Sequence, residues 1–209
     1  MALCFVAPDI VMAFSIVQIP RDEDGIRSYV GRYKQFRLDA LRLSPEAFAS
    51  TYAREAEFSD QIWYDRLANP RAATFLAYQE DTSSAIGTVT VLGPLPIGVD
   101  ELMPLGNPWV LASGEDANKL PTTAHFRING MFTLPEMRGR GVGKTLLQEA
   151  LKYAANEAVA LGREFLGSIV VNCGNEPARR LYEKCGFVAI KEEPHGDGDA
   201  TAILMKLSG

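Results

Sequence analysis

The stretch RGRGVGKTLL, Arg138–Leu147, decides the fold because it joins a strand to a helix. Before it, AHFRINGMFTL at 124–134 has strand character, and Pro135 ends that strand. A helix is predicted to begin around Gly141 and to end at Gly162. Its apolar residues recur at helical spacing and form one face, made of Leu146, Leu147, Ala150, Leu151, Ala154 and Ala158.

The glycines of this loop suit it to an anion. Glycine lets successive backbone N–H groups turn toward one centre, and such groups bind phosphate together with the dipole of the following helix. Arg138, Arg140 and Lys144 add positive charge at the rim. The loop therefore predicts a phosphate-bearing ligand, with a tight strand–helix turn that binds nothing as the alternative.

Two familiar phosphate loops do not fit the spacing. A P-loop places its first glycine five residues before Gly-Lys-Thr, and here that position is Arg138. A dinucleotide fingerprint needs G-x-G-x-x-G near the start of a βαβ unit, whereas Gly139, Gly141 and Gly143 give G-x-G-x-G late in the chain. A nucleotide-dependent phosphotransferase is therefore disfavoured.

Composition and charge narrow the class of protein. The 209 residues are 47% hydrophobic and 22% charged, which suits one globular α/β domain. The net charge of −5 argues against a nucleic-acid partner and is compatible with a cationic substrate. Three cysteines and two histidines show no metal-ligand spacing, so no metal is expected. Reduced thiols, no basic signal region and no membrane-length apolar run predict a soluble cytoplasmic protein.

The remaining elements alternate in the order of a mixed α/β domain. Residues 1–12 form a leader or an extra edge segment, compatible with a homodimer, and 13–209 form the domain. A helix with acidic first residues is expected from about 21, and a second from Ser44-Pro45 that breaks near Ser59. Residues 94–123 carry five prolines and form a long loop insertion. Strands are predicted at 13–19, 71–80, 84–96, 164–171, 187–193 and 201–207, and a short helix at 175–186.

A second motif follows the loop by about forty residues. In NEPARRLYEKCGF, 175–187, Ala178 and Tyr182 lie four apart and share one helix face. If that face meets a ligand cleft, the Tyr182 phenol lies near a reacting centre; otherwise it is a core residue. Together the two stretches resemble the GCN5-related N-acetyltransferase (GNAT) family over about 14–207. The matching positions are Arg138, Gly141 and Gly143 in the first motif, and Asn175, Ala178, Leu181, Tyr182, Gly186 and Phe187 in the second.

The resemblance implies an acyl-CoA N-acyltransferase (GNAT) fold, a single domain whose twisted mixed sheet is flanked by helices and splays open beside the strand at 125–134. It also implies acetyl-CoA as cosubstrate. The backbone of Met131, Phe132 and Thr133 would bind the pantetheine arm, and Asn175 and Tyr182 would face the cofactor. The amides of the loop would hold the pyrophosphate, through Arg138, Gly139, Arg140, Gly141, Val142, Gly143 and Lys144.

The implied activity is direct transfer of acetyl from acetyl-CoA to a primary amine in a ternary complex. Tyr182 matches the family's general acid for the leaving thiolate. A small-molecule acceptor is favoured over a protein. Because 125–134 holds no Asp or Glu, a non-catalytic acyl-CoA-binding regulatory module is the alternative.

The base for the amine is left open by the sequence. His125 has a suitable intrinsic pKa, and by strand alternation it is expected to share one face with Arg127, Asn129 and Met131. Arg127 could instead bind a substrate carboxylate. A water chain is a further alternative, as are carboxylates elsewhere in the chain, namely Glu55, Glu57, Asp100 and Glu101.

Overall fold

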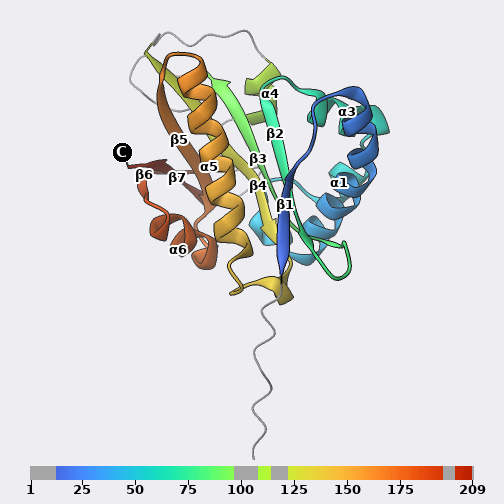
Figure 1. The fold of residues 1–209 in the computed structure, drawn as a ribbon. Helices are drawn as coiled ribbons and strands as arrows, with labels where there is room; N and C mark the ends of the chain where they lie inside the picture. Colours follow the sequence, from blue (N-terminus) through green and yellow to red (C-terminus); the bar gives the residue numbers. More distant parts are fainter. Residues whose placement is uncertain (1–12, 97–107, 114–121, 195–200, 209) are drawn as a thin grey trace, which may run out of the picture.

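The computed structural model describes residues 13–96, 108–113, 122–194 and 201–208 (Figure 1). The expectations for the leader at 1–12, for Asp100 and Glu101 and for most of the 94–123 loop lie outside these ranges.

One mixed sheet of seven strands organises the described chain, in the order β1-β2-β3-β4-β5-β7-β6. β4 and β5 run parallel, and the other neighbouring pairs are antiparallel. This confirms the predicted mixed α/β class. The strands are β1 Phe14–Gln18, β2 Ala72–Gln79, β3 Ala85–Leu95, β4 Thr123–Thr133, β5 Glu164–Asn172, β6 Phe187–Pro194 and β7 Thr201–Leu207.

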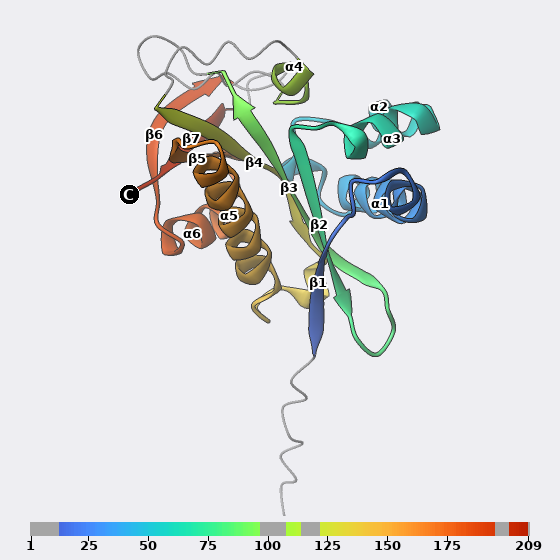
Figure 2. The ribbon, with the colours of Figure 1, turned by 45° about the horizontal axis from the view of Figure 1, so that its top comes forward.

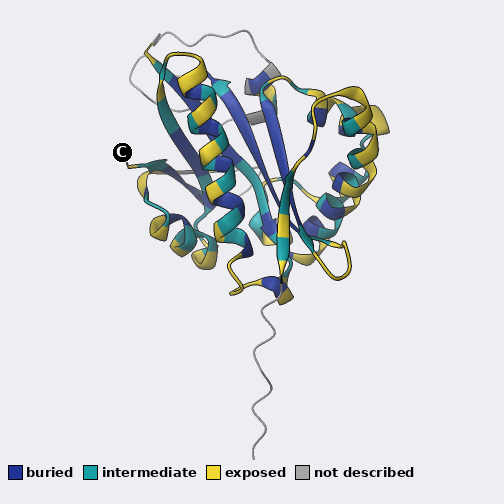
Figure 3. Cartoon of the chain, in the orientation of Figure 1, coloured by how far each residue is buried: buried dark blue, intermediate teal, exposed yellow. Residues whose placement is uncertain are grey.

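Helices cover both faces of the sheet (Figure 2). On one face, α5 Val142–Ala160 and α6 Glu176–Lys184 enclose the largest apolar core with strands β2 to β5. On the other, α1 Glu23–Leu43 and α3 Asp60–Ala68 pack with β2 around Trp63 and Leu76. The strands between these layers are mostly buried, and the helices expose their outer sides (Figure 3).

The start of α1 follows the predicted signals. The Asp22 side chain accepts a hydrogen bond of 2.9 Å from the Gly25 amide, and Glu23 and Asp24 occupy the first turn at the positive end of the dipole. The helix continues through Gly31, because its buried face of Ile26, Tyr33, Phe36, Ala40 and Leu41 outweighs the low propensity of one glycine.

The helix predicted from Ser44 is wrong in its first half. Pro45–Ala47 form a single 3-10 turn, and Phe48 returns to extended backbone. Two short helices follow, because Thr51 and Ser59 each accept a hydrogen bond from an amide three residues on and start a new helix. The first is α2, Tyr52–Ala56. In this arrangement the Phe48 ring packs against that of Phe132, and Glu55 is buried.

Another helix, α4 Pro108–Ser113, lies within the stretch predicted as an irregular loop. Ala112 is buried against Leu92 and Leu95 of β3, with Trp109 packed beside it. This packing explains why a segment with no helical period is helical: a few tertiary contacts stabilise a short helix.

Candidate active site

β4 and β5 separate halfway along the sheet. Their register runs from Thr123 beside Glu164 to Ile128 beside Ile169, and no pairing follows although both strands continue. Among the strands of the described residues, none therefore neighbours the edge of β4 from Asn129 to Thr133 on the β5 side. Such an edge can accept an extended ligand in place of a strand. The predicted splaying beside this strand is confirmed.

A bulge lies at the point where β4 leaves β5. Thr88 of β3 is opposite Phe132 and Thr90 is opposite Asn129, so β4 holds one extra residue across this step. Gly130 has φ of 59°, in the left-handed region that glycine adopts readily. The bulge turns the strand and exposes backbone groups at the splay.

The bulge corrects one expectation, that Met131 shares a face with His125 and Arg127. Beyond the bulge the alternation is reversed. Phe132 meets the α1 side, with its ring centroid 6.0 Å from that of Phe36, whereas Met131 packs in the core on the α5 side.

The glycine loop carries a row of free backbone donors. Gly139 and Gly141 have φ of 76° and 87°, and Gly141 is the N-cap of α5. In the described part of the chain, the N–H groups of residues 139–144 donate to no protein acceptor, while that of Thr145 donates to the Gly141 carbonyl. Six consecutive unpaired donors at a helix N-terminus are able to bind an anion. An ideal Cβ on Gly143 would lie 3.4 Å from atoms of Met131, Thr133 and Leu181, so the loop adjoins the end of β4.

Arg138 differs from its neighbours in the loop. Its amide donates to the Pro135 carbonyl within a 3-10 turn, Pro135–Met137. Its guanidinium donates to the Thr133 carbonyl at 3.3 Å and to the Ser44 hydroxyl at 3.1 Å, and lies over the Phe132 ring. Arg138 thus ties the loop to the end of α1 and fixes its position.

Helix α6 brings the second motif to the splayed strands. Asn175 caps it, because its side-chain oxygen accepts a hydrogen bond from the Ala178 amide. Tyr182 is buried, with its ring 6.2 Å from that of Phe187, and burial raises the pKa of its phenol. The phenol is therefore protonated at neutral pH and can donate a proton but not accept one.

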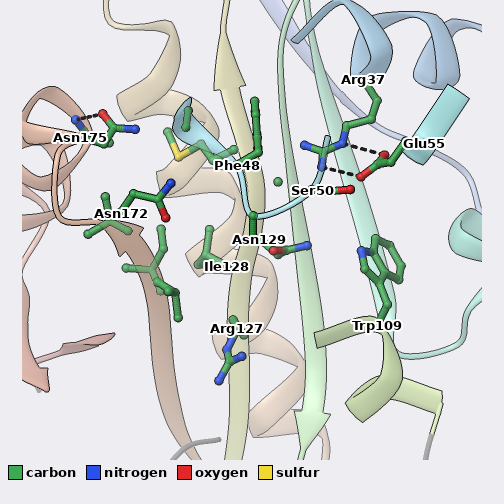
Figure 4. A pocket seen from close by; sticks show the side chains of 18 of the residues that line it. Arg37, Phe48, Ser50, Glu55, Trp109, Arg127, Ile128, Asn129, Asn172 and Asn175 are labelled. Carbon is green, nitrogen blue, oxygen red and sulfur yellow. Dashed lines mark hydrogen bonds and ion pairs between the residues drawn. The ribbon is translucent and has the colours of Figure 1, made fainter. Parts of the chain in front are cut away.

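A pocket of about 510 Å³ spans the splay. Figure 4 shows Asn172 and Asn175 on one side of β4, and Arg37, Glu55 and Trp109 on the other. Of the predicted site residues, Met131, Asn175 and Tyr182 line it. Phe132 and Thr133 do not, nor do the loop residues 138–144 and His125.

The side of the pocket formed by α1 to α4 contains a buried ion cluster. Glu55 accepts two hydrogen bonds from Arg37, at 2.8 and 3.1 Å, and one from Arg66 at 3.0 Å. Burial raises the pKa of Glu55, but the hydrogen bonds and charge of Arg37 and the charge of Arg66 outweigh it and lower the pKa to about 2. Glu55 is therefore a fixed anion and a poor proton acceptor near neutral pH.

Aromatic rings hold both arginines in place. The Arg37 Cζ lies 4.4 Å from the centroid of the Phe48 ring, and that of Arg66 lies 5.3 Å from Trp109 of α4. Stacking and pairing with Glu55, bidentate for Arg37 and through one nitrogen for Arg66, together leave little freedom to these guanidinium groups. The side chains of Arg37 and Arg66 are only 12% and 15% exposed, so the cluster is a rigid wall.

His125 lies in β4 two residues before Arg127 and does not line this pocket. It is fully buried, and its Nε2 is 2.7 Å from the Ser168 hydroxyl. Burial, helped by the charge of Arg127, lowers the pKa of His125 to about 3. Such a side chain is a weak base. Its contact with the Ser168 hydroxyl of β5 gives it a structural role within the sheet.

Sequence reasoning singled out Arg127 but missed the other arginines that line the pocket, namely Arg37, Arg54 and Arg66. Arg37 follows Tyr33 by four residues and therefore lies within the apolar stripe of α1, and a charge in such a stripe is a usable signal. Arg66 and Trp109 offer no such signal, because their place depends on how α3 and α4 meet.

Comparison with known proteins identifies the family. The model of the Acetyltransferase (GNAT) family matches residues 38–187. The chain therefore belongs to this family, and the predictions of the family, of its fold and of an acetyltransferase are confirmed. No curated protein sequence matches the chain.

Solved structures share the fold at low identity. Arabidopsis thaliana NAA60 in complex with acetyl-CoA is 16% identical with a TM-score of 0.62, over 93% of this chain and 97% of that one. A GCN5-related N-acetyltransferase from Kribbella flavida is 18% identical with a TM-score of 0.56, over 93% and 96%. The ribosomal-protein-S18-alanine N-acetyltransferase from Escherichia coli is 16% identical with a TM-score of 0.52, over 93% of each chain.

Among the described residues, no group of three or more His, Cys, Asp or Glu side chains is placed to hold a metal ion. No helix within the same residues is long and apolar enough to cross a membrane.

Proposed function

We propose that the protein transfers acetyl from acetyl-CoA directly to a primary amine, with both substrates bound at once. The observation that carries this proposal is the meeting of an unpaired β4 edge, a loop of free amides and a buried tyrosine at one splay in the sheet. Membership of the acetyltransferase family and the likeness to a structure that holds acetyl-CoA support it.

The cosubstrate is acetyl-CoA, and three parts of the chain would bind it. The amides of 139–144 would hold the pyrophosphate, with Arg140 and Lys144 adding charge. The β4 edge from Asn129 to Thr133 would bond the pantetheine arm as a strand would. Because Met131 and Tyr182 line the pocket, the thioester would enter it from the α5–α6 side.

The chemistry makes two demands of the pocket. The neutral amine nitrogen forms a bond to the thioester carbon, and the carbon–sulfur bond then breaks with its electron pair on sulfur. The leaving thiolate needs a proton, and Tyr182 is the protonated donor in this pocket. The attacking nitrogen loses a proton in turn, and we assign this step to water, because the pKa values of both His125 and Glu55 are too low for an efficient base.

Binding and turnover test this proposal separately. Calorimetry should show binding of acetyl-CoA and CoA but not of ATP. A thiol-release assay over a panel of amines should then detect turnover. Binding without turnover on any amine would favour the acyl-CoA-binding regulatory module, and absence of acetyl-CoA binding would refute both.

Tyr182→Phe isolates the proton donor, because phenylalanine keeps the ring packed against Phe187. We expect kcat to fall about 100-fold or more, with the Kd of acetyl-CoA changed little. A variant that keeps wild-type kcat would exclude Tyr182 as the general acid.

A further inference from the structure

The α1–α2 connection, residues 44–50, forms part of the pocket on its acceptor side, because residues 47–50 line it. The connection contains a 3-10 turn, Pro45–Ala47, after which Phe48 returns to extended backbone. A segment with so few backbone hydrogen bonds of its own depends on other parts of the chain for its position. The side chains that hold it therefore bear on the shape of the pocket.

Phe48 joins this connection to the buried ion cluster. Its ring centroid lies 5.9 Å from that of Phe132, and the Arg37 Cζ lies 4.4 Å from the Phe48 centroid. Arg37 in turn donates two hydrogen bonds to Glu55. Figure 4 shows Phe48 over β4, with Asn172 on one side of it and Arg37 on the other. A displacement of Phe48 would thus remove the ring that supports Arg37 and change the pocket.

A side chain from the glycine loop holds the start of the connection. The Arg138 guanidinium donates to the Ser44 hydroxyl at 3.1 Å and to the Thr133 carbonyl at 3.3 Å. Its Cζ also lies 5.7 Å from the centroid of the Phe132 ring, against which Phe48 packs. Ser44 is only 3% exposed, and its hydroxyl does not cap the turn that follows it. Arg138 therefore links the end of β4 to the α1–α2 connection.

A second hydrogen bond holds the connection from β5. The Asn172 side-chain amide donates to the Glu46 carbonyl at 2.7 Å. The connection is thus tied to both strands beyond the point at which they separate. Asn172 itself lines the pocket, whereas neither Arg138 nor Ser44 is among the described residues that do so. An effect of Arg138 or Ser44 on the acceptor must then pass through the connection.

We infer that Arg138 is a positioning residue for the acceptor: its hydrogen bond to Ser44 sets the place of Phe48 and thereby the affinity for the amine. This rests on the proposed acetyltransferase function. The loop amides at 139–144 keep their place without this side chain, because the Arg138 amide donates to the Pro135 carbonyl and Met137 is buried beside it. Loss of the guanidinium should therefore affect the acceptor and spare the cofactor.

Arg138→Met tests this split, because it removes the donors and keeps an unbranched stem over the Phe132 ring. The probe is whichever of lysine, spermidine and a short unblocked peptide the wild type acetylates with the highest kcat/KM. At saturating acetyl-CoA we expect its KM to rise about 10-fold, with the Kd of acetyl-CoA changed less than about twofold. Arg140→Gln is the matched control, which should weaken acetyl-CoA binding and keep the KM of the amine. An Arg138→Met enzyme with the opposite pattern would overturn the inference.

Variants at Ser44 show whether the two residues act through one bond. Ser44→Ala removes the acceptor of that bond, and Ser44→Thr keeps a hydroxyl. We expect Ser44→Ala to raise the KM of the amine as much as Arg138→Met does, and Ser44→Thr to stay near wild type. The double variant Ser44→Ala/Arg138→Met should be no worse than either single variant, because partners in one interaction are not additive. Additive losses would contradict the inference.

Hydrogen exchange reads the position of the connection without turnover. The amides of Ala47 and Phe48 donate to the carbonyls of Ser44 and Pro45. They should exchange about 10-fold faster in Arg138→Met and in Ser44→Ala, while the amides of α5 keep their protection. Unchanged exchange at 47–50 would overturn the inference, and if Arg138→Met does not fold, Ser44→Ala decides.

Calorimetry with acetyl-CoA keeps the two levels apart. If acetyl-CoA binds and the amine is acetylated with wild-type KM in both Arg138→Met and Ser44→Ala, this inference fails and the proposed function stands. If acetyl-CoA does not bind, or no amine is acetylated, the proposed function fails, and the inference fails with it.

Discussion

Gly143 permits a substitution that should strengthen the fold and abolish cofactor binding. It lies in the first turn of α5, its φ is not in the left-handed region, and an added Cβ meets only ordinary contacts at 3.4 Å. Gly141 is less suitable, since its φ of 87° would strain any side chain. We therefore choose Gly143→Glu, which places a carboxylate among the free amides.

Gly143→Glu should raise the stability of the fold and lower the affinity for acetyl-CoA. Replacing a helical glycine stabilises by about 1 kcal/mol, and an acidic side chain in the first turn adds about 0.5 kcal/mol through the helix dipole. A pyrophosphate in the loop would lie near the new carboxylate. At about 5 Å and an effective dielectric constant of about 20, two unit charges repel by about 3 kcal/mol. Affinity for acetyl-CoA should thus fall by roughly 150-fold.

Thermal unfolding and calorimetry measure the two effects, with Gly143→Gln as the control of equal shape and no charge. We expect a raised Tm in both variants and a much weaker Kd for acetyl-CoA in Gly143→Glu than in Gly143→Gln. Rising ionic strength should narrow the difference, because salt screens an exposed site. Equal affinities in the two variants would refute the placement of the pyrophosphate at this loop.

Three other predictions concern ionisation and capping. Glu55→Gln should cost about 3 kcal/mol of unfolding free energy in urea at pH 7, because it leaves buried Arg37 and Arg66 without their anion. Since the pKa of Glu55 is lowered to about 2 in the fold, wild type should lose this stabilisation as pH falls from about 4.5 to 2, and a variant with the same acid slope would contradict this. His125, whose pKa is lowered to about 3, should show neutral imidazole signals in NMR at pH 5, and a titration near 6.5 would contradict its burial. Asn175→Ala should cost about 1 kcal/mol through the lost cap of α6 whereas Asn175→Asp should not, and equal stabilities would contradict the cap.

The conformation of the two motifs proposed to bind the cofactor could be predicted from sequence, because their geometry is local. A strand, a glycine loop and a helix that follow one another fix the direction of the loop amides without reference to the rest of the chain. The same is true of α6, where Asn175 caps the helix that carries Tyr182 about two turns later, on nearly the same face.

The acceptor half could not be predicted, because it depends on contacts far apart in sequence. Arg37 of α1 meets Glu55 of α2, and Arg66 of α3 stacks on Trp109 of α4. Likewise the bulge at Gly130 adds one residue to β4 and reverses the alternation of its side chains. The hydrophobic pattern of the sequence does not show where this shift in strand register occurs. The face of Met131 was mistaken for this reason.

The proposed cofactor site and the proposed acceptor side of the pocket lie on opposite faces of the sheet, so one can change without the other. The loop and α6 approach β4 from the α5 side, whereas the arginine wall approaches from the side of α1 to α4. Changes in the wall need not disturb the amides at 139–144, because the sheet and the bulge stand between them. Net charge is a poor guide to such a site, because a chain of charge −5 buries Arg37 and Arg66 around Glu55 in the described part of the pocket. If the acceptor binds on the side of α1 to α4, substitution of Arg66 should change the choice of amine while acetyl-CoA still binds.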